Sequence, residues 1–236
     1  MKARFALFCL LLVPMFGKVR HRPATPPQDS AKSDLESVLS QMDQTATAFK
    51  SAQANFDWDN YQKVVDEIEK QKGHVYFRRN GSNVEAMFDI TSPAAKQVLF
   101  KDGKLRLYNP KIDQITEYDA GKSKTDVQGF LSLGFGARGH DLLKSYEVKM
   151  DGWDVIDGVK TARLELVPKS EKVRNMFNKF ILWIDPKQDV PLRQKVLQPA
   201  GDYWLSNYTN IKLKTSIPDD AFRIRSTPHT KTVTPQ

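Results

Sequence analysis

The chain has few of the residues on which metal centres and nucleophilic enzymes depend. Its 236 residues include a single cysteine, Cys9, which lies in an apolar run near the N-terminus. The rest of the chain can therefore form no disulfide, thiolate nucleophile or cysteine metal site. The histidines share no metal-ligand spacing; they are His21, His74, His140 and His229.

Sequence patterns of catalysis are lacking as well. No serine lies in a Gly-x-Ser-x-Gly sequence, and no carboxylate pair stands out from the solvated faces. Residues 134–139 match Gly-x-Gly-x-x-Gly. A dinucleotide site of that form needs a βαβ unit, whereas the surrounding chain predicts antiparallel strands and an apolar helical cluster. We expect no enzyme activity, no cofactor and no metal.

The charge balance does not indicate a nucleic-acid partner. The formal net charge is +8, but five positive residues lie within the first 22, which leaves about +3 for the rest. Those five are Lys2, Arg4, Lys18, Arg20 and Arg22.

The N-terminus has the form of a secretory signal peptide, which we place at residues 1–17. Lys2 and Arg4 precede 12 apolar residues from Phe5 to Phe16, whereas a bilayer span needs about 20. An uncleaved N-terminal anchor is the alternative, because the cleavage site is poor. Residues 18–32 are polar and Pro-rich and predict a disordered tether.

One folded domain is expected over residues 33–225, beginning with a long helix. Ser33 to Glu36 form a capping box, and an apolar stripe at helical spacing continues to about Ser51. Residues 54–59 alternate as in a strand. Residues 60–71 suit a helix and a strand about equally.

From Gly73 onward, short strands and turns follow one another closely, which predicts an antiparallel meander of about ten or eleven strands. A sheet that large curls or closes. The glycine-punctuated apolar insertion at 126–144 and the N-terminal helix are the elements that could cover its concave side. Asp151-Gly152 is predicted to form a turn, and residues 222–224 are predicted to form the last strand. Residues 226–236 are predicted to be a polar tail.

The strand Gly73–Asn80 carries an arginine on each face. Alternation places Val75, Phe77 and Arg79 on one face, opposite His74, Tyr76 and Arg78. One guanidinium should therefore lie beside an apolar surface, where it needs hydrogen-bond acceptors. The pattern alone does not say which arginine does so.

Aromatic residues recur on the predicted strands and on the insertion. Ordinary core packing explains most of them. The sharper interpretation is an apolar cavity on the concave face, large enough for a ligand, with the glycine-rich insertion as a movable lid.

Three stretches carry a resemblance to a known family. They are the strand from Gly73 to Arg79, the run Asp102-Gly-Lys104 with Tyr108-Asn-Pro110 and Gln114 behind it, and the late strand 180–185. With the order of elements from about Leu35 to Ile224, they resemble the periplasmic outer-membrane lipoprotein carrier (LolA-like) family. The resemblance implies a mainly β fold with α (α+β), an unclosed antiparallel barrel of about eleven strands under a helical lid. It also implies that the chain before Gly73 is a strand.

The resemblance further implies a function and a site. A periplasmic carrier would hold lipoprotein acyl chains in the cavity, and Arg79 would hydrogen-bond lid carbonyls. Its expected partners are an inner-membrane release transporter and an outer-membrane acceptor, with the carrier a monomer. A lipid- or lipoprotein-sensing module and a membrane-tethered acceptor are the alternatives. The predicted lipid-binding and lid residues are Arg79, Val75, Phe77, Phe88, Trp58, Phe130, Leu131, Leu133 and Phe135.

Overall fold

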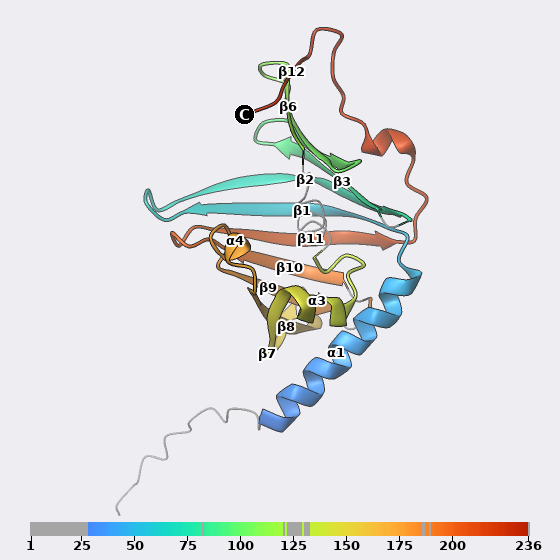
Figure 1. Ribbon diagram of the computed structural model, residues 1–236, viewed down its shortest axis with the longest axis vertical. Coiled ribbons are helices and arrows are strands. Elements are labelled where there is room, and N and C mark those ends of the chain that lie inside the picture. Colours follow the sequence, from blue (N-terminus) through green and yellow to red (C-terminus); the bar gives the residue numbers. More distant parts are fainter. Residues whose placement is uncertain are drawn as a thin grey trace, which may run out of the picture.

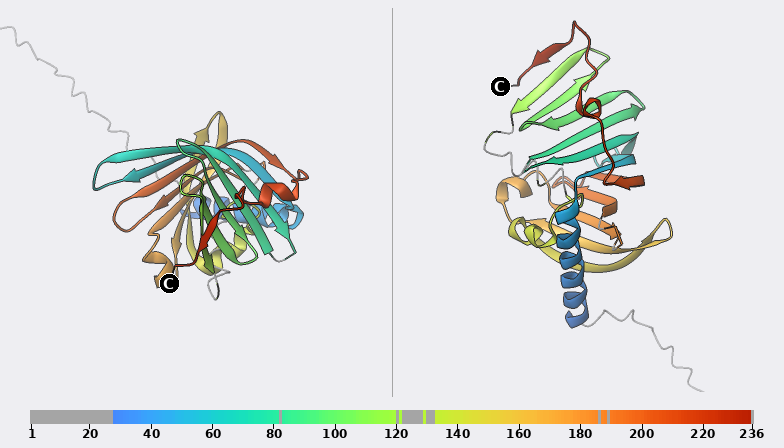
Figure 2. Two further views of the ribbon diagram at one scale, coloured as in Figure 1. Left: turned by 90° about the horizontal axis from the view of Figure 1, so that it is seen from above. Right: turned by 90° about the vertical axis from the view of Figure 1, so that its right-hand side faces the viewer.

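The computed structural model describes residues 28–81, 83–119, 121, 129, 133–185, 187–188 and 190–235. Within them the chain forms one large curved sheet with its longest helix on one face (Figures 1 and 2). The predicted signal peptide and residues 18–27 of the predicted tether lie outside these residues.

The sheet has 12 strands in the order β12-β6-β5-β4-β3-β2-β1-β11-β10-β9-β8-β7. Neighbouring strands are antiparallel except β12 and β6, which run parallel. The two ends of the sheet, β12 and β7, lie far apart, so the barrel is unclosed (Figure 2). The predicted α+β class, the antiparallel meander and the open barrel are confirmed. The strands are β1 Ser51–Gln62, β2 Glu67–Asn80, β3 Asn83–Ser92, β4 Lys96–Lys101, β5 Lys104–Asn109, β6 Gln114–Asp119, β7 Tyr146–Ile156, β8 Val159–Pro168, β9 Lys179–Asp185, β10 Val190–Leu197, β11 Tyr203–Leu213 and β12 Lys231–Val233.

The long N-terminal helix α1 spans Gln28–Ala48, and shorter helices are α3 Gly139–Ser145, α4 Glu171–Arg174 and the 3-10 turn η2 Asp219–Phe222. Helix α1 begins five residues before the predicted start at Ser33, so residues 28–32 of the predicted tether are helical. A capping box stabilises a helix end only if the chain before it leaves the helix, and here the preceding residues continue it. The apolar stripe of α1 is buried as predicted, with Val38, Leu39 and Met42 in the core.

The open question at residues 60–71 is resolved in favour of a strand. β1 and β2 pair along their whole length and turn at residues 63–66. Gly73 therefore does not begin a strand but lies within β2, next to a register shift between Lys72 and Gly73. A Cβ at this position would lie 2.1 Å from the carbonyl oxygen of Asp89, so close approach of β3 explains the glycine.

Two further predictions need correction. The predicted turn at Asp151-Gly152 is a β-bulge within the continuous strand β7, where the pairing with β8 shifts between Met150 and Trp153. The predicted strand at 222–224 is replaced by η2, because Phe222 is buried against the outer face of the sheet with Met87, Leu99 and Ile217.

The polar tail is also more ordered than predicted. Its residues 231–233 form β12 beside β6, and Asp113 fixes the approach. The Asp113 carboxylate accepts hydrogen bonds from Thr227 Oγ1 at 2.6 Å and Thr230 Oγ1 at 2.5 Å, which lower its pKa. Main-chain pairing with a sheet edge requires no apolar side chains, so the composition did not reveal the strand.

The two faces of the sheet differ in what covers them. The inner face carries two apolar clusters. One surrounds α1 and strands β7–β10, and the other surrounds strands β1–β4. The outer face carries a small third cluster under η2. The helices α1, α3 and α4 lie on the inner side (Figure 1).

Candidate functional site

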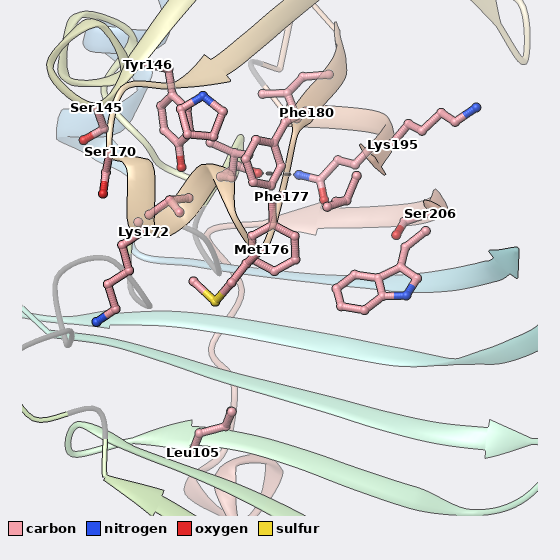
Figure 3. A pocket seen from close by; sticks show the side chains of 18 of the residues that line it. Leu105, Ser145, Tyr146, Ser170, Lys172, Met176, Phe177, Phe180, Lys195 and Ser206 are labelled. Atoms are coloured by element: carbon pink, nitrogen blue, oxygen red, sulfur yellow. Dashed lines mark hydrogen bonds between the residues drawn. The ribbon is translucent and has the colours of Figure 1, made fainter. Parts of the chain in front are cut away.

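A cavity of about 810 Å³ lies between the two inner clusters. That volume falls within the range of pockets that bind drug-sized ligands. Its walls are mostly aromatic and aliphatic, and Figure 3 shows Met176, Phe177 and Phe180 on one side of it and Leu105 on the other. The apolar lining includes Trp58, Phe77, Phe88, Val98, Leu105, Leu133, Tyr146, Phe177, Phe180, Leu182, Val196 and Trp204.

Four of the predicted lipid-binding residues line this cavity: Trp58, Phe77, Phe88 and Leu133. Val75 and Phe135 lie beside it in the packed core, 0% and 2% exposed. Phe135 stacks on Phe77 with ring centroids 4.6 Å apart. Phe130 and Leu131 lie outside the described residues, and Arg79 is not among the residues that line the cavity.

The predicted set omits the wall formed by β7–β11 and α4. Val173 on α4 and Met176 just after that helix both line the cavity. Their spacing of three residues is the signal that could have placed one face of a short helix against an apolar surface. Gln194, Trp204 and Tyr208 line the cavity as well. Periodicity does not identify such neighbours across a sheet.

The aromatic wall is a contiguous stack. Trp58 and Phe88 are parallel with centroids 5.8 Å apart, and Trp204 lies 6.3 Å from Trp58. These residues come from β1, β3 and β11, neighbours in or near the centre of the sheet. Such a surface offers large apolar contact with few polar groups to desolvate.

Arg79 connects the sheet to the helices above it. Its side chain lies on the inner face with Val75 and Phe77, as alternation predicts. Nη1 donates to the carbonyl oxygen of Ala46 at 3.2 Å, and Nη2 donates to that of Gly136 at 2.5 Å. The guanidinium also lies 5.7 Å from the Phe49 ring centre. One charged side chain thus holds the end of α1 and the described part of the insertion together.

Arg78 lies on the opposite face and has different partners. It donates to Glu85 Oε2 at 2.6 Å and to Asp219 Oδ1 at 2.6 Å, and it stacks over the Phe222 ring. These contacts hold η2 to the outer face. The arginine that touches the insertion is therefore Arg79.

The glycines of the insertion allow it to approach α1 closely. A Cβ on Gly136 would lie 2.3 Å from the Phe49 ring, and one on Gly139 would lie 2.3 Å from the carbonyl oxygen of Leu39. Gly136 also has a φ of +68°. The Gly-x-Gly-x-x-Gly pattern therefore serves helix packing, and no βαβ unit surrounds it among the described residues.

A second contact holds the insertion from the cavity floor. Gln194 on β10 donates from Nε2 to the carbonyl oxygen of Leu133. The Tyr208 hydroxyl on β11 donates to Gln194 Oε1 at 2.9 Å and so orients the amide. Burial raises the pKa of Tyr208, which keeps this donor protonated.

A third contact joins α3 to α1 through His140. Its Nδ1 lies 2.6 Å from Asp43 Oδ2, its backbone N–H donates to Asp43 Oδ1 at 3.1 Å, and its Nε2 lies 3.2 Å from Glu36 Oε1. The hydrogen bond to Asp43 raises the pKa of His140. Burial favours protonation of Asp43, but hydrogen bonds from His140 outweigh it and lower the pKa of Asp43.

The arrangement is suited to binding apolar chains. It combines an aromatic cavity with an adjoining segment that is held through backbone carbonyls. Water can replace such hydrogen bonds. None of the helices among the described residues is long and apolar enough to cross a membrane.

Comparison with solved structures gives matches at low sequence identity, and the two with a TM-score of at least 0.50 share the fold. An uncharacterized conserved protein from Thermus thermophilus aligns with a TM-score of 0.55 and 11% identity, over 86% of this chain and 99% of that chain. MucB aligns with a TM-score of 0.50 and 16% identity, over 83% of this chain and 63% of that chain. A LolA superfamily protein from Nitrosomonas europaea aligns with a TM-score of 0.41 and 17% identity, over 80% of this chain and 97% of that chain.

No curated protein sequence matches the chain. Residues 47–225 do match the family described as outer membrane lipoprotein carrier protein LolA. The match covers more than half of the chain, including the cavity walls, Arg79 and the described part of the insertion. The chain therefore belongs to the LolA family of outer membrane lipoprotein carrier proteins.

Proposed function

We propose that this protein is a periplasmic carrier that binds the acyl chains of lipoproteins in its cavity and delivers them to the outer membrane. The observation that carries the proposal is the apolar cavity of about 810 Å³, which lies beside a segment that Arg79 holds by backbone carbonyls. Family membership supports the same class of cargo.

Release requires that binding be reversible. Each buried methylene contributes about 0.8 kcal/mol, so several fully buried chains would bind too tightly to be passed on. Closing the insertion restores the Arg79 bonds to Ala46 and Gly136 and so competes with bound chains. The carrier has no catalytic role in this proposal. An inner-membrane transporter loads it, and an outer-membrane acceptor unloads it.

Binding of a fluorescent triacylated lipopeptide tests the proposal. Wild-type protein should co-elute with the probe in gel filtration as a monomer and pass it to acceptor vesicles. Val196→Trp fills the cavity from a wall residue that is 9% exposed and should weaken binding. Val155→Trp, at a position 69% exposed on β7, is the matched control. Equal binding by both variants would contradict the cavity as the site.

The sensing and tethered alternatives give different outcomes in the same preparation. A sensor would bind the probe but co-purify with a membrane partner. A tethered acceptor would retain residues 1–17, which the mass of the mature protein reveals.

A further inference from the structure

The cavity is apolar along most of its walls but has a basic corner. Three lysines line it there: Lys144 at the end of α3, Lys169 after β8 and Lys172 on α4. The hydroxyl residues Ser145 and Ser170 lie beside them, and Figure 3 shows both serines next to Lys172 at one end of the pocket.

The backbone brings these residues together. The N–H of Lys169 donates to the carbonyl oxygen of Ser145 at 2.9 Å, which joins the end of α3 to the start of the α4 segment. Lys169 Nζ donates to the Leu143 carbonyl at 2.6 Å, one of the three donors that an ammonium carries. Lys144 pairs with Asp141 at 2.7 Å, and both of these side chains are at least half exposed. Such an exposed pair is weak and can exchange partners.

Lysines outnumber carboxylates among the described residues that line the cavity. Asp119 is the one carboxylate of that set, and it lies on β6, whereas α3 and α4 are next to β7 and β8 in the chain. A fourth lining lysine, Lys195, lies with its Nζ 3.9 Å from the Tyr203 ring centre. The corner thus offers positive charge and hydroxyl donors directly beside Tyr146, Phe177 and Met176.

We infer that the cavity also accepts a glycerophospholipid with an anionic headgroup, its phosphate at Lys144, Lys169 and Lys172 and its acyl chains on the aromatic wall. The lipid anchor of a lipoprotein is neutral at the glyceryl end, so the lysines would not be needed for it. The inference rests on the proposed acyl-binding function and adds a second class of ligand. The charge of the three lysines favours an anionic headgroup over a neutral one, so a preference of roughly tenfold or more is expected.

Equilibrium binding of three dioleoyl lipids to the full chain tests the headgroup inference. The lipids are phosphatidylglycerol, phosphatidylcholine and dioleoylglycerol. Binding is measured at about 50 mM salt, where screening of charges is weak. Wild type should bind phosphatidylglycerol about tenfold more tightly than the other two. A triple variant should bring the affinities for phosphatidylglycerol and phosphatidylcholine close to each other. It combines Lys144→Gln, Lys169→Gln and Lys172→Gln. The control replaces three exposed lysines outside the cavity, Lys70, Lys111 and Lys149, by Gln and should keep the ratio.

Two further measurements keep the test decisive. In wild type, salt at about 500 mM should reduce the preference for phosphatidylglycerol, because screening weakens exposed charge contacts. Glycerol 3-phosphate should not displace the lipid at equal concentration, and displacement would overturn the inference in favour of a site for free phosphate. Equal affinity for all three lipids would overturn the headgroup inference alone, whereas binding of none would overturn the acyl-binding function itself.

Discussion

Arg79 on β2 donates a hydrogen bond to the backbone carbonyl of Gly136, and this contact ties the centre of the sheet to the segment beside the cavity. The same guanidinium reaches Ala46 at the end of α1. Hydrogen bonds from a charged donor contribute about 1.5–3 kcal/mol each, yet their acceptors here are neutral carbonyls. Opening the segment therefore leaves no unpaired buried carboxylate behind.

Replacing Arg79 should slow cargo release. Arg79→Leu removes both hydrogen bonds that stabilise the closed segment. Closure of the segment then competes less well with bound acyl chains, so the chains stay bound longer. We expect transfer of a lipopeptide to a purified acceptor to be about 5- to 10-fold slower, corresponding to roughly 1–1.4 kcal/mol. Arg78→Leu is the control on the outer face, and it should leave the transfer rate unchanged. It leaves the buried Glu85 with Lys101, 3.7 Å away, as its remaining ion-pair partner, and should cost about 2–4 kcal/mol of stability. Unchanged transfer in Arg79→Leu would remove the proposed role.

Gly136→Ala should destabilise the closed insertion more than a glycine replacement in a turn. A Cβ at Gly136 would overlap the Phe49 ring, in addition to the cost of a positive φ. We expect Gly136→Ala to lower the free energy of unfolding, measured with denaturant, by about 2–4 kcal/mol. Gly158→Ala should lower it by about 1–2 kcal/mol. Gly158 has a φ of +80° and no atom within 4 Å of its added Cβ, so it isolates the backbone cost. Equal losses would mean that the Phe49 contact is easily relieved.

The contact of His140 with α1 should make stability depend on pH. The pKa of His140 is raised in the folded protein, so its contribution is fully present below the ordinary value of 6.5 and is lost as pH rises through the raised pKa. The pKa of Asp43 is lowered, so its contribution is present above 3.8 and is lost as pH falls through the lowered pKa. Glu36 on α1 and Arg138, Asp141 and Lys144 around α3 are the other charged groups nearby.

Hydrogen exchange of α3 between about pH 5.5 and 9, a range that brackets the titration of a histidine with a raised pKa, measures this dependence. Protection in wild type should fall toward the alkaline end, and His140→Gln should flatten the profile. A variant profile as steep as that of wild type would assign the dependence to other groups.

Tryptophan fluorescence should report on occupancy of the cavity. Trp58 and Trp204 line it, whereas Trp153 donates to Asp34 and Trp183 donates to Asp154 elsewhere in the fold. An acyl ligand should shift the emission of wild type and of the Trp153→Phe/Trp183→Phe double variant. The shift should vanish in Trp58→Phe/Trp204→Phe. A response confined to Trp153 and Trp183 would place the ligand outside the cavity.

The alternation of β2 was readable from the sequence because side chains of a strand point to opposite faces. It placed Arg79 with Val75 and Phe77, and the family resemblance singled it out over Arg78. The acceptors Ala46 and Gly136 could not be derived, since they are backbone atoms from 33 and 57 residues away in sequence. Hydrophobic periodicity records which face is buried, but it does not record what covers that face.

Other features depended on long-range packing and were missed for that reason. The wall around Phe177 and Trp204 forms only when the sheet curves, and α4 is too short for a helical pattern to emerge. The strand β12 arises from pairing with β6 and from Asp113 contacts with a polar segment. The bulge in β7 and a turn share the same Asp-Gly signal, so sequence alone did not separate them.

Native mass spectrometry of the protein purified from its native cells, without detergent, examines whether the cavity holds acyl chains in the cell. We expect a fraction of molecules to carry a bound diacyl or triacyl species, reduced in Val196→Trp and retained in Val155→Trp. A uniformly ligand-free protein that also fails to take up a triacylated lipopeptide would contradict a carrier function for this cavity.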